Sequence, residues 1–177
     1  MGLPHNTRRY AMLKKMLYML SVTLLFAFSN AQAAEYDAAV VKGWKARAER
    51  GDASAQCLLA MCYDLSNCEG IPHDYVKARK WYEKAAAQGD ADAQFNLGVM
   101  YRQGKGVRQD YVKARKWYEK AAAQGDADAQ NNLGALYHNG QGVRQNKRTA
   151  KEWFGKACDN GAQMGCDNYR KLNEMGF

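Results

Sequence analysis

An internal repetition constrains this chain more than any other feature of its sequence. Residues 74–93 read DYVKARKWYEKAAAQGDADA, and residues 110–129 repeat that string without a change, 36 positions later. A fixed period of about 20–50 residues is typical of stacked arrays, in which one unit cannot bury its apolar face alone. Extending the match predicts three units, residues 51–88, 89–124 and 125–160, the first with two extra residues.

Each unit has the pattern of two helices joined by a turn. In the second unit, apolar residues recur at three- and four-residue spacing over positions 90–103, which predicts a first helix. Gly104 and Gly106 then interrupt the pattern, because glycine readily adopts the backbone conformation that ends a helix. Asp110 is a natural N-cap for a second helix, which is expected to end before Gly125.

The residues that carry this pattern resemble the Sel-one-like repeat, a longer relative of the tetratricopeptide repeat. The third unit departs from it at Asn146, which replaces the capping Asp, and the first unit has Ala60 in place of a Gly. The resemblance implies an all-α fold, a right-handed superhelical solenoid of antiparallel helix pairs, and work as a protein scaffold or adaptor. The matched positions of the second unit are Ala93, Leu97, Gly98, Tyr101, Gly104, Gly106, Val107, Asp110, Ala114, Trp117, Ala121, Ala122 and Gly125.

The two ends of the chain differ from the repeated units. Residues 34–50 resemble a lone second helix and residues 161–177 a lone first helix, so we expect them to cap the array. Residues 1–33 combine a basic start, a short apolar run and an Ala-Gln-Ala site, which predicts a secretory signal peptide. An uncleaved anchor is the alternative, and Met12 is an alternative start.

Removal of the leader lowers the net charge. Residues 1–33 contain 4 of the 26 Lys and Arg and none of the 18 Asp and Glu, which leaves +4 on residues 34–177. This excess does not indicate a nucleic-acid partner, and no membrane span is expected after cleavage. The basic run 77–80 and its copy at 113–116 are expected on the solvated face of the second helices. Contact with acidic lipid or a polyanion is the alternative.

All five cysteines follow the leader, and export to an oxidising compartment favours disulfides. Cys158 ends one predicted helix and Cys166 begins the next, so antiparallel helices would bring the two thiols together. The same arrangement is typical of the cysteine-rich secreted branch of the family that the chain resembles. Two buried free thiols are the alternative.

The first unit contains the other three cysteines. Cys62 and Cys68 are the second expected pair, joining a helix end to the following turn, and Cys57 is then the expected free thiol. Zinc binding by Cys62, Cys68 and His73 is the alternative, but this spacing matches no standard site and a fourth ligand is missing. We therefore predict no metal site.

The sequence predicts no catalytic residues and no cofactor. Residues 34–177 contain no Ser-x-x-Lys, Gly-x-Ser-x-Gly or phosphate-binding loop. Some cysteine-rich members of the family that the chain resembles are labelled β-lactamases. A β-lactamase-like or cell-wall hydrolase is therefore the alternative function.

Near-identical units differ mainly on one face of their first helices, which tetratricopeptide geometry would place along a concave groove. Such differences favour recognition of a protein or peptide, with drift at exposed positions as the alternative. We thus expect a non-enzymatic binding scaffold of the bacterial cell envelope, periplasmic or secreted, whose partner the sequence does not identify. The predicted groove residues are Asp92, Phe95, Val99 and Arg102 in the second unit, and Asp128, Asn131 and His138 in the third.

Overall fold

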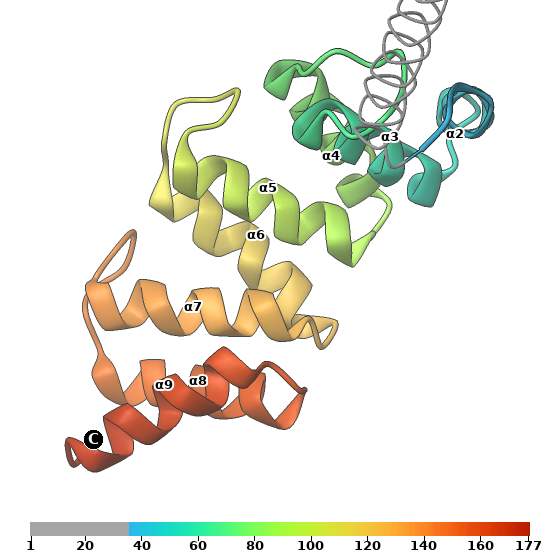
Figure 1. Ribbon diagram of the computed structural model, residues 1–177. Coiled ribbons are helices and arrows are strands. Elements are labelled where there is room, and N and C mark those ends of the chain that lie inside the picture. Colours follow the sequence, from blue (N-terminus) through green and yellow to red (C-terminus); the bar gives the residue numbers. More distant parts are fainter. Residues whose placement is uncertain (1–35) are drawn as a thin grey trace, which may run out of the picture.

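The computed structural model describes residues 36–177, so the predicted signal peptide lies outside the described part. This part contains no helix that is both long and apolar enough to cross a membrane. Its eight helices follow one another in a stack (Figure 1). They are α2 (Ala38–Glu49), α3 (Ala53–Leu65), α4 (Tyr75–Ala87), α5 (Ala91–Gln103), α6 (Tyr111–Ala123), α7 (Ala127–Asn139), α8 (Lys147–Asp159) and α9 (Gln163–Glu174).

The helices form two layers. The first helices of the units (α3, α5, α7) and α9 make one layer, and the second helices (α4, α6, α8) with α2 make the other. Each helix packs on the next one in the chain, as a solenoid of helix pairs requires. In addition, α5 contacts α7 and α7 contacts α9, whereas α4, α6 and α8 make no comparable contacts with one another. The first helices therefore lie on the inner side of the curve.

Local signals place the helix ends where the sequence predicts them. The side chains of Asp90 and Asp110 accept hydrogen bonds from backbone N–H groups of the first turns of α5 and α6. Asn146 does the same for α8, because its side chain accepts a hydrogen bond from the Thr149 amide at 3.1 Å. The third unit therefore keeps the cap although Asn stands where the other units have Asp. Gly104 ends α5 with a φ of 74°, in the left-handed region that glycine tolerates.

The core lies between the layers and uses small residues for close approach. Leu97 of α5 is fully buried where α5 packs on α4, the second helix of the preceding unit. It belongs to one core cluster with Tyr82, Ala85 and Met100. Gly98 faces the Tyr118 ring so closely that a Cβ atom would overlap it. This contact lets α5 and α6 approach, which explains the Gly at this position of the repeat.

A buried glutamine links each unit to the helix before it. Gln94 is buried, donates a hydrogen bond from Nε2 to the Ala86 carbonyl at 3.3 Å and accepts one from Gln124 at 2.9 Å. Because both bonds are shielded from water, losing either partner would leave a buried polar group unsatisfied. The same pair of bonds recurs for Gln56 with Ala48 and Gln88, and for Gln130 with Ala122 and Asn160.

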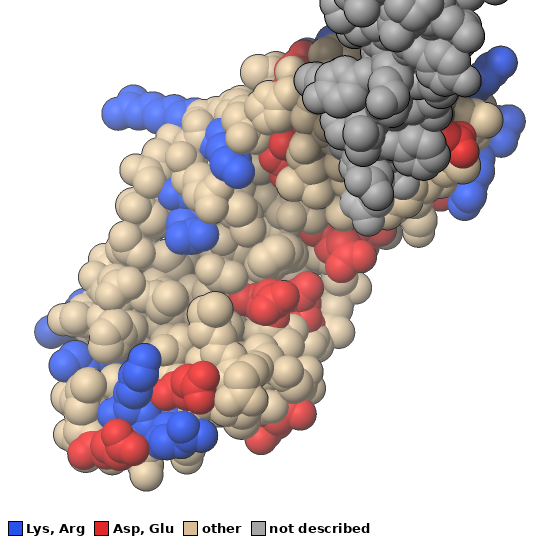
Figure 2. Space-filling model, viewed as in Figure 1, with Lys and Arg blue, Asp and Glu red and all other residues tan. Residues whose placement is uncertain are grey.

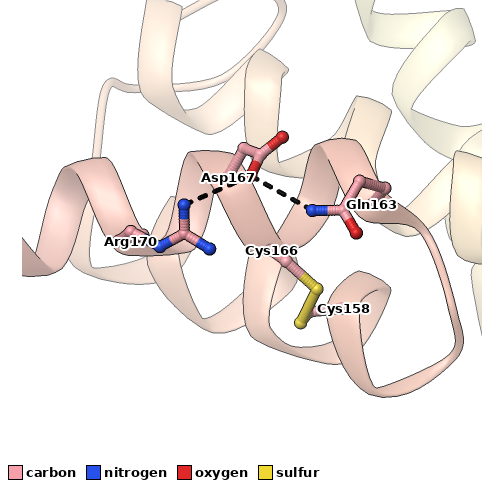
Figure 3. The surroundings of a disulfide bond; sticks show 5 residues. All are labelled: Cys158, Gln163, Cys166, Asp167 and Arg170. Atoms are coloured by element: carbon pink, nitrogen blue, oxygen red, sulfur yellow. Dashed lines mark hydrogen bonds and ion pairs between the residues drawn. A yellow bond between two sulfur atoms is a disulfide. The ribbon is translucent and has the colours of Figure 1, made fainter.

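At the last junction, between α8 and α9, a disulfide stands where the other junctions have the glutamine hydrogen bonds. Cys158 and Cys166 stand 36 residues after Ala122 and Gln130, and their Cα atoms are 4.5 Å apart. Figure 3 shows the bond between the end of α8 and the start of α9, with Asp167 accepting from Gln163 beside it. The C-terminal helix is thus joined covalently where the other units use hydrogen bonds.

The second disulfide, Cys62–Cys68, shapes the turn of the first unit. That turn pairs with the chain that enters α2, since Tyr36 accepts a hydrogen bond from the Glu69 amide at 3.0 Å. The Glu69 carboxylate in turn accepts from the Ala38 amide at the start of α2. Cys57 is a buried free thiol, and burial, with Asp90 nearby, raises its pKa.

Candidate interaction face on the first helices

The predicted groove residues lie on adjacent helices of the inner layer. Asp92 and Asp128 are exposed at the starts of α5 and α7. Phe95, Val99 and Arg102 follow along α5, and each is half-buried. Because α5 and α7 contact each other, these side chains and those of α7 form one continuous surface, which we call the inner face.

Phe95 is partly held by the protein itself. Its ring lies 5.9 Å from the ring of Tyr118, centroid to centroid, at a tilted angle. Together with Val99 it packs against the core cluster between α6 and α7. The aromatic ring is therefore oriented before any ligand arrives, while part of it stays open to solvent.

Hydroxyl groups from the second helices reach the same surface. Arg102 donates from Nε to the Tyr118 hydroxyl at 3.3 Å. Burial raises the pKa of Tyr118 to about 12, although Arg102 opposes this shift. In the first unit the corresponding pair is Asp64 and Tyr82. Burial raises the pKa of Asp64, while Lys105, His73 and the Tyr82 hydroxyl lower it.

The third unit breaks this pairing. His138 stands where Arg102 stands in the second unit, but its counterpart on the second helix is Phe154, which has no hydroxyl. Within residues 36–177, His138 Nδ1 is buried and has no hydrogen-bond partner. A buried polar atom without a partner costs free energy. His138 as a whole is half-buried, so part of its side chain still reaches the inner face.

The prediction that Asn131 is open to a ligand differs from the structure, in which this side chain is buried. It is only 9% exposed, because α9 covers it. Its amide accepts a hydrogen bond from Asn168 at 3.1 Å and donates to the sulfur of Met164 at 3.5 Å. Asn131 therefore joins α7 to the C-terminal helix and is not itself open on the inner face.

Acidic side chains collect where the first helices begin. Figure 2 shows them on the flank where α5 and α7 start. Asp92, Asp126 and Asp128 belong to this group, and none of them forms an ion pair within the described residues. Burial raises the pKa of Asp126, and the neighbouring charges of Asp128 and Asp92 add to the shift.

We expect Asp126→Asn to raise the stability of the protein at pH 7. Asn preserves the cap, as Asn146 does on α8, and removes a charge that the folded state disfavours. The raised pKa means that ionised Asp126 costs stability above its folded-state pKa. This cost vanishes below the unfolded value of about 3.9. Thermal melts at pH 7 and pH 3 test this, and an equal gain at both pH values would contradict it.

The sequence analysis did not identify Tyr82 and Tyr118, whose hydroxyls reach polar groups of the inner layer. A signal existed, because the charged residues Asp64 and Arg102 pair with Tyr, whereas His138 pairs with Phe154. Elsewhere in the described residues, no group of three or more His, Cys, Asp or Glu side chains could hold a metal ion.

Comparison with known families gives one result for the repeated region. The Sel1 repeat matches three times, at residues 53–90, 91–126 and 127–161. A sequence comparison with curated proteins gives no significant match.

Solved structures of three bacterial proteins are similar to this chain. A Sel1 repeat protein from Oxalobacter formigenes is 35% identical over 72% of this chain and 51% of its own, with a TM-score of 0.67. The protective antigen c5321 of uropathogenic Escherichia coli, which displays an SLR fold, is 34% identical over 77% of this chain and 33% of its own, with a TM-score of 0.66. Helicobacter pylori cysteine rich protein B is 30% identical over 72% of this chain and 96% of its own, with a TM-score of 0.57. The chain thus covers about half of the first of these proteins and a third of the second.

Proposed function

This chain belongs to the Sel1 repeat family, and from that premise we propose that it is a non-enzymatic scaffold that binds a protein or peptide segment on its inner face. The observation that carries the proposal is where near-identical units differ. Between α5 and α7 the exposed or half-buried residues Phe95, Val99 and Arg102 become Asn131, Ala135 and His138. Met100 and Leu136 are buried in both units, and this exchange conserves apolar character, whereas Asn131 is buried only because α9 covers it.

The inner face offers contacts suited to a polypeptide. Phe95 presents an oriented aromatic ring, and buried aromatic residues tend to dominate the energy of protein interfaces. Arg102 presents a planar donor group for a carboxylate or a backbone carbonyl. His138 adds a half-buried imidazole at the end of α7. The contact set that we propose is Asp92, Phe95, Val99, Arg102, Asp128 and His138.

We further propose that the protein acts in the periplasm or outside the cell. Two disulfides support this location, because such bonds persist in oxidising compartments and are rare in the bacterial cytoplasm. The predicted signal peptide, residues 1–33, agrees with it. Nothing in the described residues supports the hydrolase alternative, and we do not propose it.

Phe95→Ala is expected to weaken peptide binding by about 2 kcal/mol, or about 30-fold in Kd, because it removes the apolar anchor. Panning a random-peptide phage library on the purified protein supplies the probe. Fluorescence anisotropy of a selected, labelled peptide then gives Kd for each variant.

Val112→Ala is the matched control, since Val112 is an exposed apolar side chain on α6, in the other layer. It should leave Kd unchanged. Failure to enrich any peptide would refute peptide binding. Peptides that bind Phe95→Ala as tightly as the original protein would move the site away from the inner face.

A further inference from the structure

Charge is divided unequally between the two layers of the solenoid. The second-helix layer, α2, α4, α6 and α8, contains 15 Lys and Arg against 5 Asp and Glu, an excess of +10. The first-helix layer, α3, α5, α7 and α9, contains 3 against 5, a balance of −2. Both layers have 51 helical residues, so the difference reflects composition and not size.

On α4 and α6 this charge points away from the core. The buried side of α4 consists of Ala78, Tyr82, Ala85 and Ala86. Helical spacing puts the exposed residues Val76, Lys77, Lys80 and Lys84 on the opposite side, and the copied sequence of α6 repeats the arrangement. We call the resulting surface the lysine face. It consists of Val76, Lys77, Lys80, Lys84, Val112, Lys113, Lys116 and Lys120.

Most of the positive charge on the lysine face is uncompensated. The arginines of the same helices pair along the helix with glutamates, Arg79 with Glu83 and Arg115 with Glu119. Lys77 and Lys113 lie 3.3 and 3.9 Å from their capping aspartates. The remaining four lysines, Lys80, Lys84, Lys116 and Lys120, form no ion pair within residues 36–177.

Apolar and aromatic groups lie among these lysines. Val76 and Val112 are 47% and 46% exposed, at the same position of successive units. The ammonium groups of Lys84 and Lys120 lie over the half-buried rings of Trp81 and Trp117 at 4.1 and 4.2 Å. The surface therefore offers point charges and apolar side chains together over two neighbouring units.

We propose that the lysine face binds the surface of an anionic phospholipid bilayer. Clustered lysines near such a surface are attracted by its negative potential, and each one adds to the attraction. The free cations are ammonium groups and not the planar forks of arginine, so they suit diffuse attraction better than shaped recognition of one anion. The exposed valines favour a bilayer over a soluble polyanion, because only the bilayer offers an apolar region beneath its charges.

This binding would hold the protein peripherally and leave the inner face, in the other layer, free for its ligand. The lysine face and the inner face are separate surfaces, so the bilayer proposal does not depend on the proposed peptide binding. Failure of either one leaves the other standing.

Vesicle co-sedimentation of residues 34–177, which follow the predicted signal peptide, tests the proposal, because the basic and apolar leader would bind vesicles by itself. Binding to vesicles of phosphatidylcholine with 30% phosphatidylglycerol should exceed binding to phosphatidylcholine alone, and 0.5 M NaCl should abolish the excess. The variant Lys80→Glu/Lys116→Glu should lower the partition coefficient on the anionic vesicles at least about tenfold. Neither lysine has a partner in the described residues, so both changes should leave the fold intact, which circular dichroism verifies.

Arg170→Glu/Lys171→Glu on α9 is the matched control, because it changes the net charge equally in the other layer. It should lower the partition coefficient less than about twofold. Equal losses in the two variants would overturn the proposal, since net charge alone would then explain binding. Equal binding to neutral and anionic vesicles would also overturn it, as would retention on a heparin column without binding to anionic vesicles.

Discussion

Leu97→Ala is expected to lower the free energy of unfolding by about 2–5 kcal/mol. Leu97 is fully buried and packs between its own helix and the second helix of the preceding unit, against Tyr82 and Ala85. Truncation would remove apolar contacts and leave a cavity at the junction, because close-packed helices relax only partly around lost volume. Since each unit is stabilised by its neighbour, the substitution should lower the stability of the whole array and not of α5 alone.

Urea denaturation followed by circular dichroism measures this change. An m-value close to that of the original protein would show that the array still unfolds as one unit. Phe95→Ala is the control on the same helix. Phe95 is only half-buried, so it should lose clearly less stability than Leu97→Ala. If both variants lose the same stability and peptide binding is unaffected, Phe95 is a core residue and its place in the proposed contact set is wrong.

Removing the Cys158–Cys166 disulfide is expected to cost roughly 2–3 kcal/mol of stability. The bond joins residues 8 apart in the sequence, and opening this short loop increases the conformational freedom of the unfolded chain. The variant Cys158→Ser/Cys166→Ser should also expose Asn131, because α9 would lose its covalent attachment beside it. The side of α7 that α9 covers would then be more exposed to solvent.

Urea denaturation of this double variant, with and without reductant, isolates the effect of the bond. Reductant should destabilise the double variant less than it destabilises the original protein, because only Cys62–Cys68 remains to be reduced. Peptide mapping without reduction should show the peptides of Cys158 and Cys166 linked. Recovery of both as alkylated thiols without prior reduction would contradict the pairing and weaken the case for an oxidising compartment.

Much of the fold could be predicted from the sequence because its signals are local or periodic. The 36-residue repetition indicates the number and length of the helix pairs, and α5 and α6 begin and end close to the predicted positions. Capping by Asp110 and the left-handed turn at Gly104 depend on a few neighbouring residues. The candidate site was predicted by transferring the geometry of a related repeat. This transfer indicates which positions face the groove, but not which other side chains pack around them.

The neighbours of each candidate site residue come from parts of the chain that are distant in the sequence. Asn131 has a surface position in the repeat, yet α9 buries it, and only the packing of the last helix shows this. The tyrosine hydroxyls beside the inner face, and the glutamine bonds between units, likewise depend on side chains that meet across helices. The sequence by itself determined the helices, their caps and their repetition, because these follow from short-range backbone and spacing preferences. Only the tertiary structure decided which polar atoms are satisfied and which side chains stay open, because burial depends on every neighbour that packs against a residue.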